Sequence, residues 1–228
     1  MKCKILPSLL AADPGFLAQG AERAATSGAD ELHLDIMDGH FVPNISMGPA
    51  VVAMAGRHVS IPLNVHLMLT HPDRYVEAFA KAGADTLYIH VEAACNVMDT
   101  LHQIQALGMK PGITMNPDTR PEALFPFLAD VSDVLVMTVR PGYGGQAFMP
   151  EALPAIRAIR EHCRHADRPD MQIMVDGGIN IETAGQCAEA GANAFVAGTF
   201  LYAAENMDAL IARMRDVTTS AYSRYWTK

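Results

Sequence analysis

Residues 33–44, HLDIMDGHFVPN, carry side chains whose types and spacing could do chemistry. Successive side chains of an extended strand point to opposite faces, so His33, Asp35 and Met37 share one face. A histidine and a carboxylate two positions apart can both reach one metal ion or one substrate. The Asp-Gly turn signal that begins at Asp38 ends the strand, which places these groups at its C-terminal end. A strand with an incidental polar face is the alternative interpretation.

Polar groups at the ends of other predicted strands make that alternative less favourable. The strand predicted at 61–67 contains His66, and the strand predicted at 172–175 leads into Asp176. Together with the residues of the strand at 32–37, they give a set of two imidazoles and two carboxylates: His33, Asp35, His66 and Asp176. Such a set suits Zn²⁺, Mn²⁺, Fe²⁺ or Co²⁺, and the ligand types do not choose among these ions. We expect His90 to support a ligand or the fold rather than to bind the ion.

Three glycine-bearing loops follow the last three predicted strands: PGYGGQ at 141–146, DGGI at 176–179 and GT at 198–199. Glycine lets the backbone approach an anion closely, and free N–H groups at a helix start bind phosphate. Tight turns without a ligand are the alternative. A phosphate site is favoured because the three loops adjoin if the strands form a barrel. Arg140, beside the first loop, could aid the anion or face solvent.

The elements that must position these groups alternate between strand and helix along the whole chain. Strands are predicted at 5–9, 32–37, 61–67, 86–90, 110–115, 134–139, 172–175 and 194–198. Helices are predicted at 13–27, 49–56, 72–82, 96–107, from about 119, and at 150–162, 181–190 and 204–217. Eight such units without a linker favour an α/β fold, a single (β/α)8 TIM barrel over residues 1–228. A doubly wound open sheet is disfavoured because no GxGxxG follows the first strand.

Composition narrows the classes of partner. The net charge of −8 and the absence of a basic run disfavour nucleic acid and anionic membrane surfaces. No apolar run approaches the roughly 18 residues of a membrane helix. The four cysteines show no CxxC spacing, which favours reduced thiols and a cytoplasmic protein. A small anionic substrate, held by local donors, remains compatible with this charge.

A phosphate anchor, a Lewis acid and two carboxylates suggest proton transfer next to a carbonyl. The metal would hold a ketone oxygen and the neighbouring hydroxyl oxygen and stabilise an enediolate. Of Asp35 and Asp176, one would remove the proton from the carbon and the other would return a proton on the opposite face. Three methionines would roof the reactive carbon, with core packing as an equal alternative: Met37, Met68 and Met137.

Lysine is absent from every predicted C-terminal strand end. The lysines of the chain are Lys2, Lys4, Lys81, Lys110 and Lys228. A Schiff-base aldolase needs a lysine in the site and is therefore disfavoured. The DxKxxD pattern of decarboxylase-type phosphate barrels is also missing, which disfavours a lyase of that group.

Six motifs together resemble the ribulose-phosphate 3-epimerase family over nearly the whole chain: SLLAAD, HLDIMDGHFVPN, VHLM, MTVRPGYGGQAF, VDGGI and AGANAFVAGT. The resemblance implies a metal-dependent barrel of the ribulose-phosphate-binding type. Its activity would interconvert ribulose 5-phosphate and xylulose 5-phosphate in the pentose phosphate pathway. It implies Asp35 and Asp176 as the acid/base pair. It also implies one divalent metal and a homo-oligomer, a dimer or a hexamer.

The same resemblance assigns the substrate contacts. Ser8 and His66 would touch the substrate. Backbone and side-chain groups of three loops would hold its phosphate end: Gly142, Tyr143, Gly144, Gly145, Gly177, Gly178, Gly198 and Thr199.

Two segments depart from the family pattern. Arg140 stands in MTVRPG where a small polar or acidic residue is expected, and GTFLYAAENM resembles the allulose-6-phosphate 3-epimerase branch. The substrate therefore stays open between a five-carbon and a six-carbon ketose phosphate. A phosphosugar-binding barrel without catalysis is a third hypothesis, disfavoured by the two aspartates. The polar segment 218–228 packs either on the barrel or on a neighbour.

Overall fold

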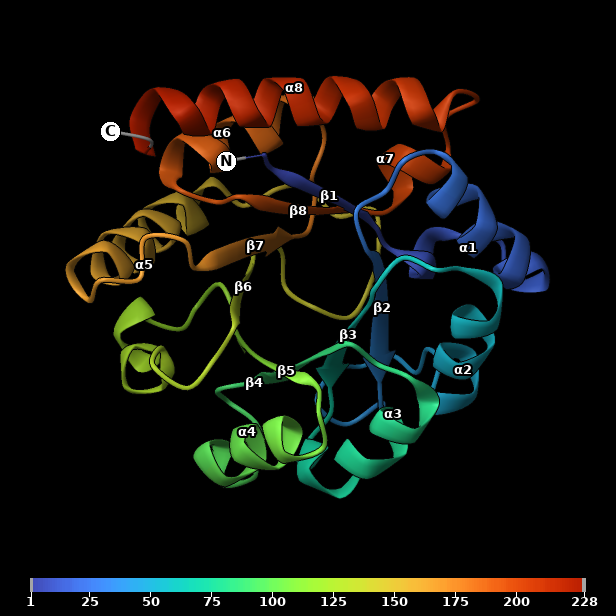
Figure 1. Ribbon diagram of the computed structural model, residues 1–228, viewed down its shortest axis with the longest axis horizontal. Helices are drawn as coiled ribbons and strands as arrows, with labels where there is room; N and C mark the ends of the chain where they lie inside the picture. The colour runs from blue at the N-terminus through green and yellow to red at the C-terminus, as the bar shows by residue number, and fades with distance from the viewer. Residues whose placement is uncertain (1, 227–228) are drawn as a thin grey trace.

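The computed structural model describes residues 2–226, and its centre is one sheet of eight parallel strands. The strands run in the order β1-β8-β7-β6-β5-β4-β3-β2. Their bounds are β1 (Lys4–Pro7), β2 (Leu32–Met37), β3 (Leu63–Met68), β4 (Thr86–His90), β5 (Lys110–Met115), β6 (Asp133–Met137), β7 (Gln172–Asp176) and β8 (Ala194–Ala197). A parallel bridge between Ser8 and His33 joins the two ends of this order. The sheet thereby closes into the predicted barrel (Figure 1).

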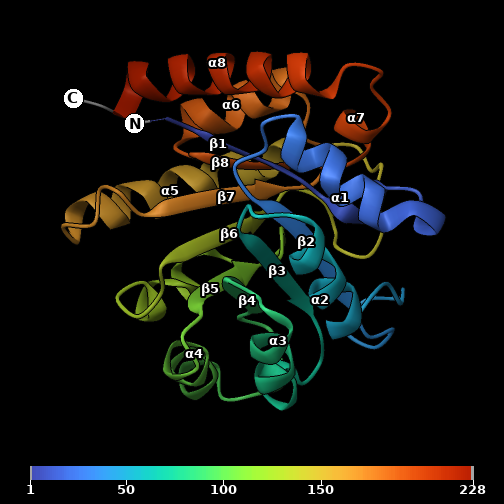
Figure 2. The same cartoon turned by 45° about the vertical axis from the view of Figure 1, so that its right-hand side comes forward.

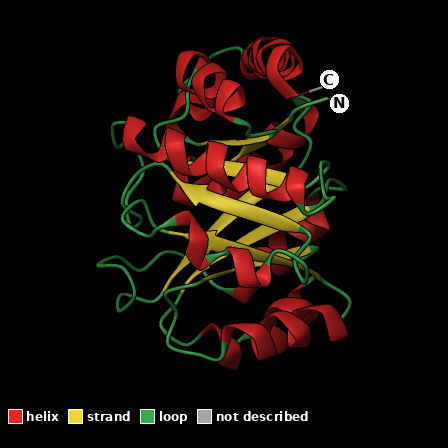
Figure 3. Ribbon diagram, turned by 90° about the vertical axis from the view of Figure 1, so that its left-hand side faces the viewer, coloured by secondary structure: helices red, strands yellow, loops and turns green. Residues whose placement is uncertain are grey.

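The helices lie outside the strands, as Figure 3 shows in red around yellow. They are α1 (Leu17–Thr26), α2 (Pro49–His58), α3 (Val76–Ala82), α4 (Val97–Ala106), α5 (Leu153–His165), α6 (Ile181–Ala190), α7 (Thr199–Tyr202) and α8 (Met207–Trp226). Six short 3₁₀ turns complete the order: η1 (Leu9–Ala11), η2 (Pro14–Phe16), η3 (Pro72–Arg74), η4 (Pro121–Ala123), η5 (Phe125–Phe127) and η6 (Pro150–Ala152). Among the described residues, no helix is both long enough and apolar enough to cross a membrane.

The two faces of the strands bury different side chains. Leu32, Leu34 and Ile36 of β2 belong to the large cluster between sheet and helices. Inside the barrel a smaller apolar cluster includes Tyr88, and β5 contributes a glycine next to it. A Cβ on that residue, Gly112, would lie 2.3 Å from Tyr88 Cδ1, so the tyrosine ring occupies space that only glycine leaves free. The face predicted for His33 and Asp35 is therefore the barrel interior.

The helix predicted from about residue 119 is wrong. The segment after β5 forms only the 3₁₀ turns η4 and η5. Pro126 lies five residues after Pro121, lacks an N–H group and would clash with the carbonyl four residues before it. An α-helix therefore cannot continue through this segment, and short 3₁₀ turns take its place.

The final helix is longer than predicted. α8 continues nine residues past 217, to Trp226, and lies along α6 (Figures 1 and 2). Tyr222 is buried, and Trp226 Nε1 donates to the carbonyl of Glu189 at the end of α6, 3.1 Å away. The segment predicted as a polar tail therefore packs on its own barrel, apart from Thr227 and Lys228, which lie outside the described residues.

Smaller differences concern the strand ends. The strands predicted at 5–9, 134–139 and 194–198 end at Pro7, Met137 and Ala197. The strand predicted at 61–67 spans 63–68 instead, and the short helix α7 was not predicted. After β1 and β8 the chain leaves the sheet earlier because η1 and α7 begin two residues beyond the strand, whereas β6 is followed by a loop.

Asp133 is the first residue of β6 and lies at the end of the barrel away from the site. Its ionisation should make the free energy of unfolding depend on pH. Burial, reinforced by repulsion from Glu31, raises the pKa of Asp133 from 3.8 to about 6. A carboxyl whose pKa is higher in the folded protein stabilises the fold while protonated, and this contribution is lost as pH rises through about 6. Asp133→Asn stays neutral at every pH. We expect it to raise the free energy of unfolding at pH 8 by about 1 to 3 kcal/mol.

Urea denaturation at two pH values measures this difference. The gain should shrink to roughly a third of its pH 8 value near pH 4.5. Asp208→Asn, at an exposed position of α8, is the matched control and should show no such trend. A gain that is equal at both pH values would contradict the explanation.

Candidate active site

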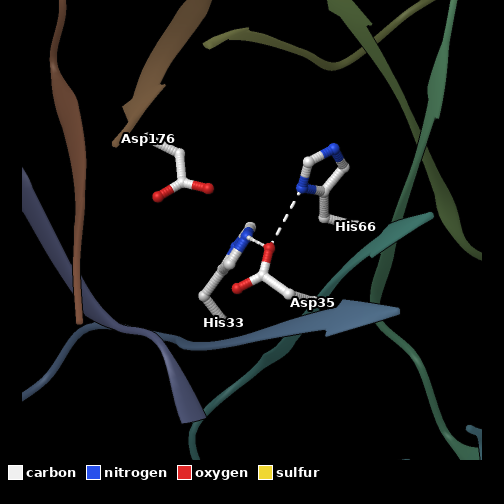
Figure 4. A group of neighbouring side chains, drawn as sticks. All are labelled: His33, Asp35, His66 and Asp176. Atoms are coloured by element: carbon white, nitrogen blue, oxygen red, sulfur yellow. Dashed lines mark hydrogen bonds and ion pairs between the residues drawn. The ribbon is translucent and has the colours of Figure 1, made fainter. Parts of the chain in front are cut away.

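Four polar side chains meet inside the barrel near the C-terminal ends of its strands (Figure 4). β2 supplies His33 and Asp35, β3 supplies His66, and β7 supplies Asp176 from the other side of the group. One donor atom from each residue lies within 4.8 Å of the others. Asp35 Oδ1 lies 3.2 Å from His33 Nε2 and 3.1 Å from His66 Nδ1. The register of the sheet explains this closeness, because Asp35 stands opposite His66.

The donor set fits a divalent metal ion. Four ligands at about 2.1 Å from a tetrahedral ion are about 3.4 Å apart, close to the two Asp35–histidine distances. Both histidines are fully buried, and Asp35 is 3% exposed. Buried carboxylates normally pair with cations or coordinate metals. The residues expected from the sequence to share one ion are thus brought together.

The surroundings shift the pKa values of the two carboxylates, Asp35 and Asp176, in opposite directions. Burial raises the pKa of Asp176, and repulsion from Asp35 raises it further. Burial would also raise the pKa of Asp35, but attraction to His33 and the hydrogen bond from its ring hold it well below its usual range. Burial lowers the pKa of His66. Two carboxylates with opposite shifts are the pattern of an acid/base pair.

A chain of hydrogen bonds that begins at Asn64 orients His33. Its Nδ1 lies 2.8 Å from Asn64 Oδ1, and the Asn64 amide donates to Glu31 Oε2 at 2.9 Å and to the Tyr88 hydroxyl at 3.1 Å. The amide oxygen accepts the Nδ1–H, which leaves Nε2 free to face the site. Sequence reasoning missed Asn64. Its signal was a polar side chain two positions before His66, on the same face of β3.

A cavity of about 280 Å³ opens above the four side chains. Its lining includes Ser8, Asp35, Met37, Met68, Met137, Gly142, Tyr143, Gly144, Gly145, Asp176, Gly177, Gly178, Gly198 and Thr199. Ser8 Oγ donates to Asp35 Oδ2 at 2.6 Å. His66, which the resemblance places against the substrate, is fully buried and is not part of this lining. The three methionines border the cavity beside both aspartates.

The three glycine loops meet at one part of this cavity. Cβ atoms added to Gly144 and Gly145 would lie 3.9 and 3.8 Å from Thr199 Oγ1. α7 begins at Thr199, and a short extra helix at this place contributes to the phosphate site of many such barrels. Gly178 has φ +65°, and its Cβ would lie 2.5 Å from the backbone nitrogen of Phe148. Packing alone therefore requires glycine at Gly178, whereas it imposes no such requirement at Gly144.

The loop after β2 covers the loop after β6. Asn44 Nδ2 donates to the carbonyl of Gly142 at 2.7 Å, and the Tyr143 hydroxyl donates to the carbonyl of Pro43 at 2.6 Å. Arg140 points elsewhere: it forms an ion pair with Asp118 at 3.0 Å and is 70% exposed. Its side chain does not line the cavity, so its departure from the family pattern lies outside the site.

Comparison with known proteins agrees with this geometry. Residues 4–202 match the model of the ribulose-phosphate 3 epimerase family. The chain is 42% identical to the ribulose-phosphate 3-epimerase of Bacillus subtilis (strain 168), over 93% of this chain and 98% of that protein. It is 43% identical to the cytoplasmic isoform of ribulose-phosphate 3-epimerase of Oryza sativa subsp. japonica, over 93% of this chain and 92% of that protein.

Two solved structures share the fold at low sequence identity. KGPDC from Streptococcus mutans has a TM-score of 0.72 at 14% identity and covers 99% of this chain and 100% of its own. A mutant tryptophan synthase α-subunit from Pyrococcus furiosus has a TM-score of 0.68 at 16% identity and covers 96% of this chain and 100% of its own. These likenesses support the barrel and nothing finer.

Proposed function

The chain belongs to the ribulose-phosphate 3-epimerase family, and we propose that it interconverts D-ribulose 5-phosphate and D-xylulose 5-phosphate at carbon 3. One observation carries this proposal. A single cavity is lined by two carboxylates, whose pKa values are shifted in opposite directions, and by three glycine loops. The first group can move protons, and the second can hold a phosphate.

The chemistry of the step follows from the chain's own side chains. A divalent ion held by the two histidines and two aspartates would supply Lewis-acid stabilisation of an enediolate. Asp35 and Asp176 come from β2 and β7, so a substrate between them meets a carboxylate on each face. One carboxylate takes the proton from carbon 3 and the other returns a proton on the opposite face, which inverts that carbon.

Neighbouring residues support this exchange. Ser8 holds Asp35 by its hydrogen bond. Met37, Met68 and Met137 border the cavity and offer no proton that could compete with the carboxylates. We assign Zn²⁺, Mn²⁺, Fe²⁺ or Co²⁺ to the ion, since imidazole and carboxylate suit each of them.

The substrate test is a paired assay. Ribulose 5-phosphate and allulose 6-phosphate are compared by kcat/KM, with incorporation of solvent deuterium at carbon 3. We expect kcat/KM for the pentulose to be higher by roughly 10-fold or more, the range that one extra group in a pocket can decide. A preference for allulose 6-phosphate would assign the chain to the hexulose branch. Tight binding of either sugar without turnover would favour the non-catalytic barrel.

Gly144→Ala tests the phosphate cradle. The added methyl group meets only Thr199 Oγ1, at 3.9 Å, so the fold should keep its stability. It would nevertheless stand on the cavity wall and keep the phosphate from the backbone. We expect KM to rise about 10-fold with kcat nearly unchanged, the loss of about one charge-assisted hydrogen bond.

The control for this variant is Gly56→Ala in α2, whose added methyl would make an ordinary 3.5 Å contact with Leu63 Cδ1. It should leave KM unchanged. An unchanged KM in Gly144→Ala as well would mean that the phosphate binds elsewhere.

We also propose a homo-oligomer, a dimer or a hexamer, in the cytoplasm. Exposed apolar side chains follow the C-terminal ends of several strands: Phe16, Ile45, Tyr75 and Tyr143. The four cysteines are free, which supports a reducing compartment. Size-exclusion chromatography with light scattering tests the assembly, and a monomer at micromolar concentration would contradict it. The small-molecule partner is the ketose phosphate.

A further inference from the structure

A chain of side chains leads from His66 away from the cavity to the protein surface. His66 Nε2 lies 2.8 Å from His90 Nε2, and His90 Nδ1 lies 3.0 Å from Glu92 Oε2. The ring centroids lie 5.0 Å apart and the ring planes are inclined by 27°. Both rings are fully buried, whereas the side chain of Glu92 is 25% exposed. The three residues form a continuous hydrogen-bonded path that ends in a carboxylate.

The Glu92 carboxylate is itself fixed by the loop after β5. Its Oε1 accepts from the backbone N–H of Asn116 at 2.9 Å and from the Thr119 hydroxyl. Its Oε2 accepts from His90. Both oxygens therefore face donors only. Hydrogen bonds from His90, Thr119 and Asn116 outweigh burial and lower the pKa of Glu92, so the carboxylate stays ionised.

When both imidazoles are neutral, as metal binding through His66 Nδ1 requires, these contacts allow one arrangement of protons along the path. Glu92 can only accept, so His90 Nδ1 carries the hydrogen and His90 Nε2 presents a lone pair. His66 Nε2 must then carry a hydrogen to donate to that lone pair. His66 Nδ1 is left with its lone pair pointing at the site, 3.1 Å from Asp35 Oδ1. This is the tautomer in which His66 can bind a metal ion through Nδ1.

We propose that Glu92, acting through His90, is a positioning residue that fixes the tautomer and the ring orientation of His66 as an Nδ1 ligand. The proposal rests on the metal centre of the proposed function. Metal-binding histidines generally donate their second N–H to an acceptor that sets their orientation and raises their basicity. Here the acceptor is His90, and the carboxylate of Glu92, just after β4, determines which of its ring nitrogens carries the hydrogen.

Glu92→Gln is the sharpest test because the glutamine amide has one oxygen and cannot accept hydrogen bonds from both His90 and Asn116 in the geometry of the carboxylate. If its oxygen faces His90, its NH₂ opposes the N–H of Asn116. If its NH₂ faces His90, the ring must reverse its tautomer and oppose the N–H of His66. We expect Zn²⁺, added to the purified metal-free protein in competition with a chromophoric chelator, to bind about 10- to 100-fold more weakly. Glu151→Gln, an exposed position beyond β6, is the matched control and should bind Zn²⁺ as the wild type does.

A second pair of variants keeps the test decisive if Glu92→Gln folds poorly. His90→Gln can offer an oxygen to His66 and an NH₂ to Glu92, which preserves the order of donor and acceptor. His90→Leu removes both. We expect His90→Leu to lose about 10- to 100-fold in Zn²⁺ affinity and His90→Gln to recover most of it. Nitrogen-15 spectra of the zinc-loaded wild type should show hydrogen on His66 Nε2 and on His90 Nδ1.

The outcomes separate the two proposals. If the wild-type protein binds no divalent metal, both the metal centre and the positioning role of Glu92 are overturned. If the wild type binds Zn²⁺ tightly and Glu92→Gln and His90→Leu bind it equally tightly, only the positioning role is overturned. The reverse tautomers in the spectra, or equal losses in His90→Gln and His90→Leu, also overturn the positioning role. Weaker binding in Glu92→Gln and His90→Leu, with recovery in His90→Gln, supports it.

Discussion

Replacing Asp176 by asparagine is expected to lower kcat for epimerisation by about 1,000-fold, within the range of general acid–base catalysis. Asparagine keeps the shape of the side chain but can neither take nor give the proton. Asp176 borders the cavity opposite Asp35, and burial and repulsion from that neighbour raise its pKa. Without a bound ion it is the carboxylate of the pair that more readily holds a proton, while Asp35 is held ionised. A coupled spectrophotometric assay in both directions measures the loss.

Isotope exchange shows whether the two aspartates serve opposite faces. In deuterium oxide, Asp176→Asn should still exchange the carbon 3 hydrogen of the epimer whose hydrogen faces Asp35, without converting it. Asp35→Asn should show the mirror-image result with the other epimer. Measuring the metal content of each variant separates loss of the acid/base group from loss of a ligand.

The control for these variants is Asp208→Asn, an exposed substitution on α8 that should leave kcat unchanged. Catalysis that survives in both Asp35→Asn and Asp176→Asn would remove the two-base mechanism altogether.

Removal of the metal should have the second large effect. Prolonged treatment with a chelator is expected to lower turnover by at least about 100-fold, the scale of losing one preorganised electrostatic stabiliser in the transition state. The stripped protein should also unfold at a lower temperature. An ion present at about 1,000 times its dissociation constant contributes about 4 kcal/mol to the free energy of unfolding. Without an ion, the buried Asp35 and the half-buried Asp176 also repel each other.

Adding back Zn²⁺, Mn²⁺, Fe²⁺ or Co²⁺ singly should restore turnover and identify the preferred ion. His66→Gln removes a ligand and should respond weakly to added metal. His58→Gln is the matched control because His58 lies on the surface and pairs with Glu22. Full turnover in protein shown by elemental analysis to be free of metal would contradict a metal-dependent reaction.

The sequence by itself determined the barrel and the composition of its site. Alternation of apolar and polar residues is a local signal, so Leu32, Leu34 and Ile36 could be assigned to one face and His33 and Asp35 to the other. Parallel strands bring their C-terminal ends to one rim, so polar residues far apart in the chain could be expected to meet there. That reasoning identified all four side chains around the centre.

Only the tertiary structure decided which partners these side chains have. The amide of Asn64 beneath His33 and the path from His66 to Glu92 depend on atoms from different strands. No spacing within one strand encodes such contacts, because they are set by the register and curvature of the closed sheet. The direction of Arg140, toward Asp118 and away from the cavity, was likewise open until the loops were placed.

The two errors have different physical origins. The helix predicted from about 119 is absent because Pro126, five residues after Pro121, interrupts the backbone hydrogen bonds, a local signal that was available in the sequence. The helical end of α8 had no such signal, since Tyr222 and Trp226 are ordered by contacts with α5 and α6. Local patterns thus determined the elements and the rim of the barrel. Packing between distant segments determined the ends of the elements and the orientation of every side chain in the site.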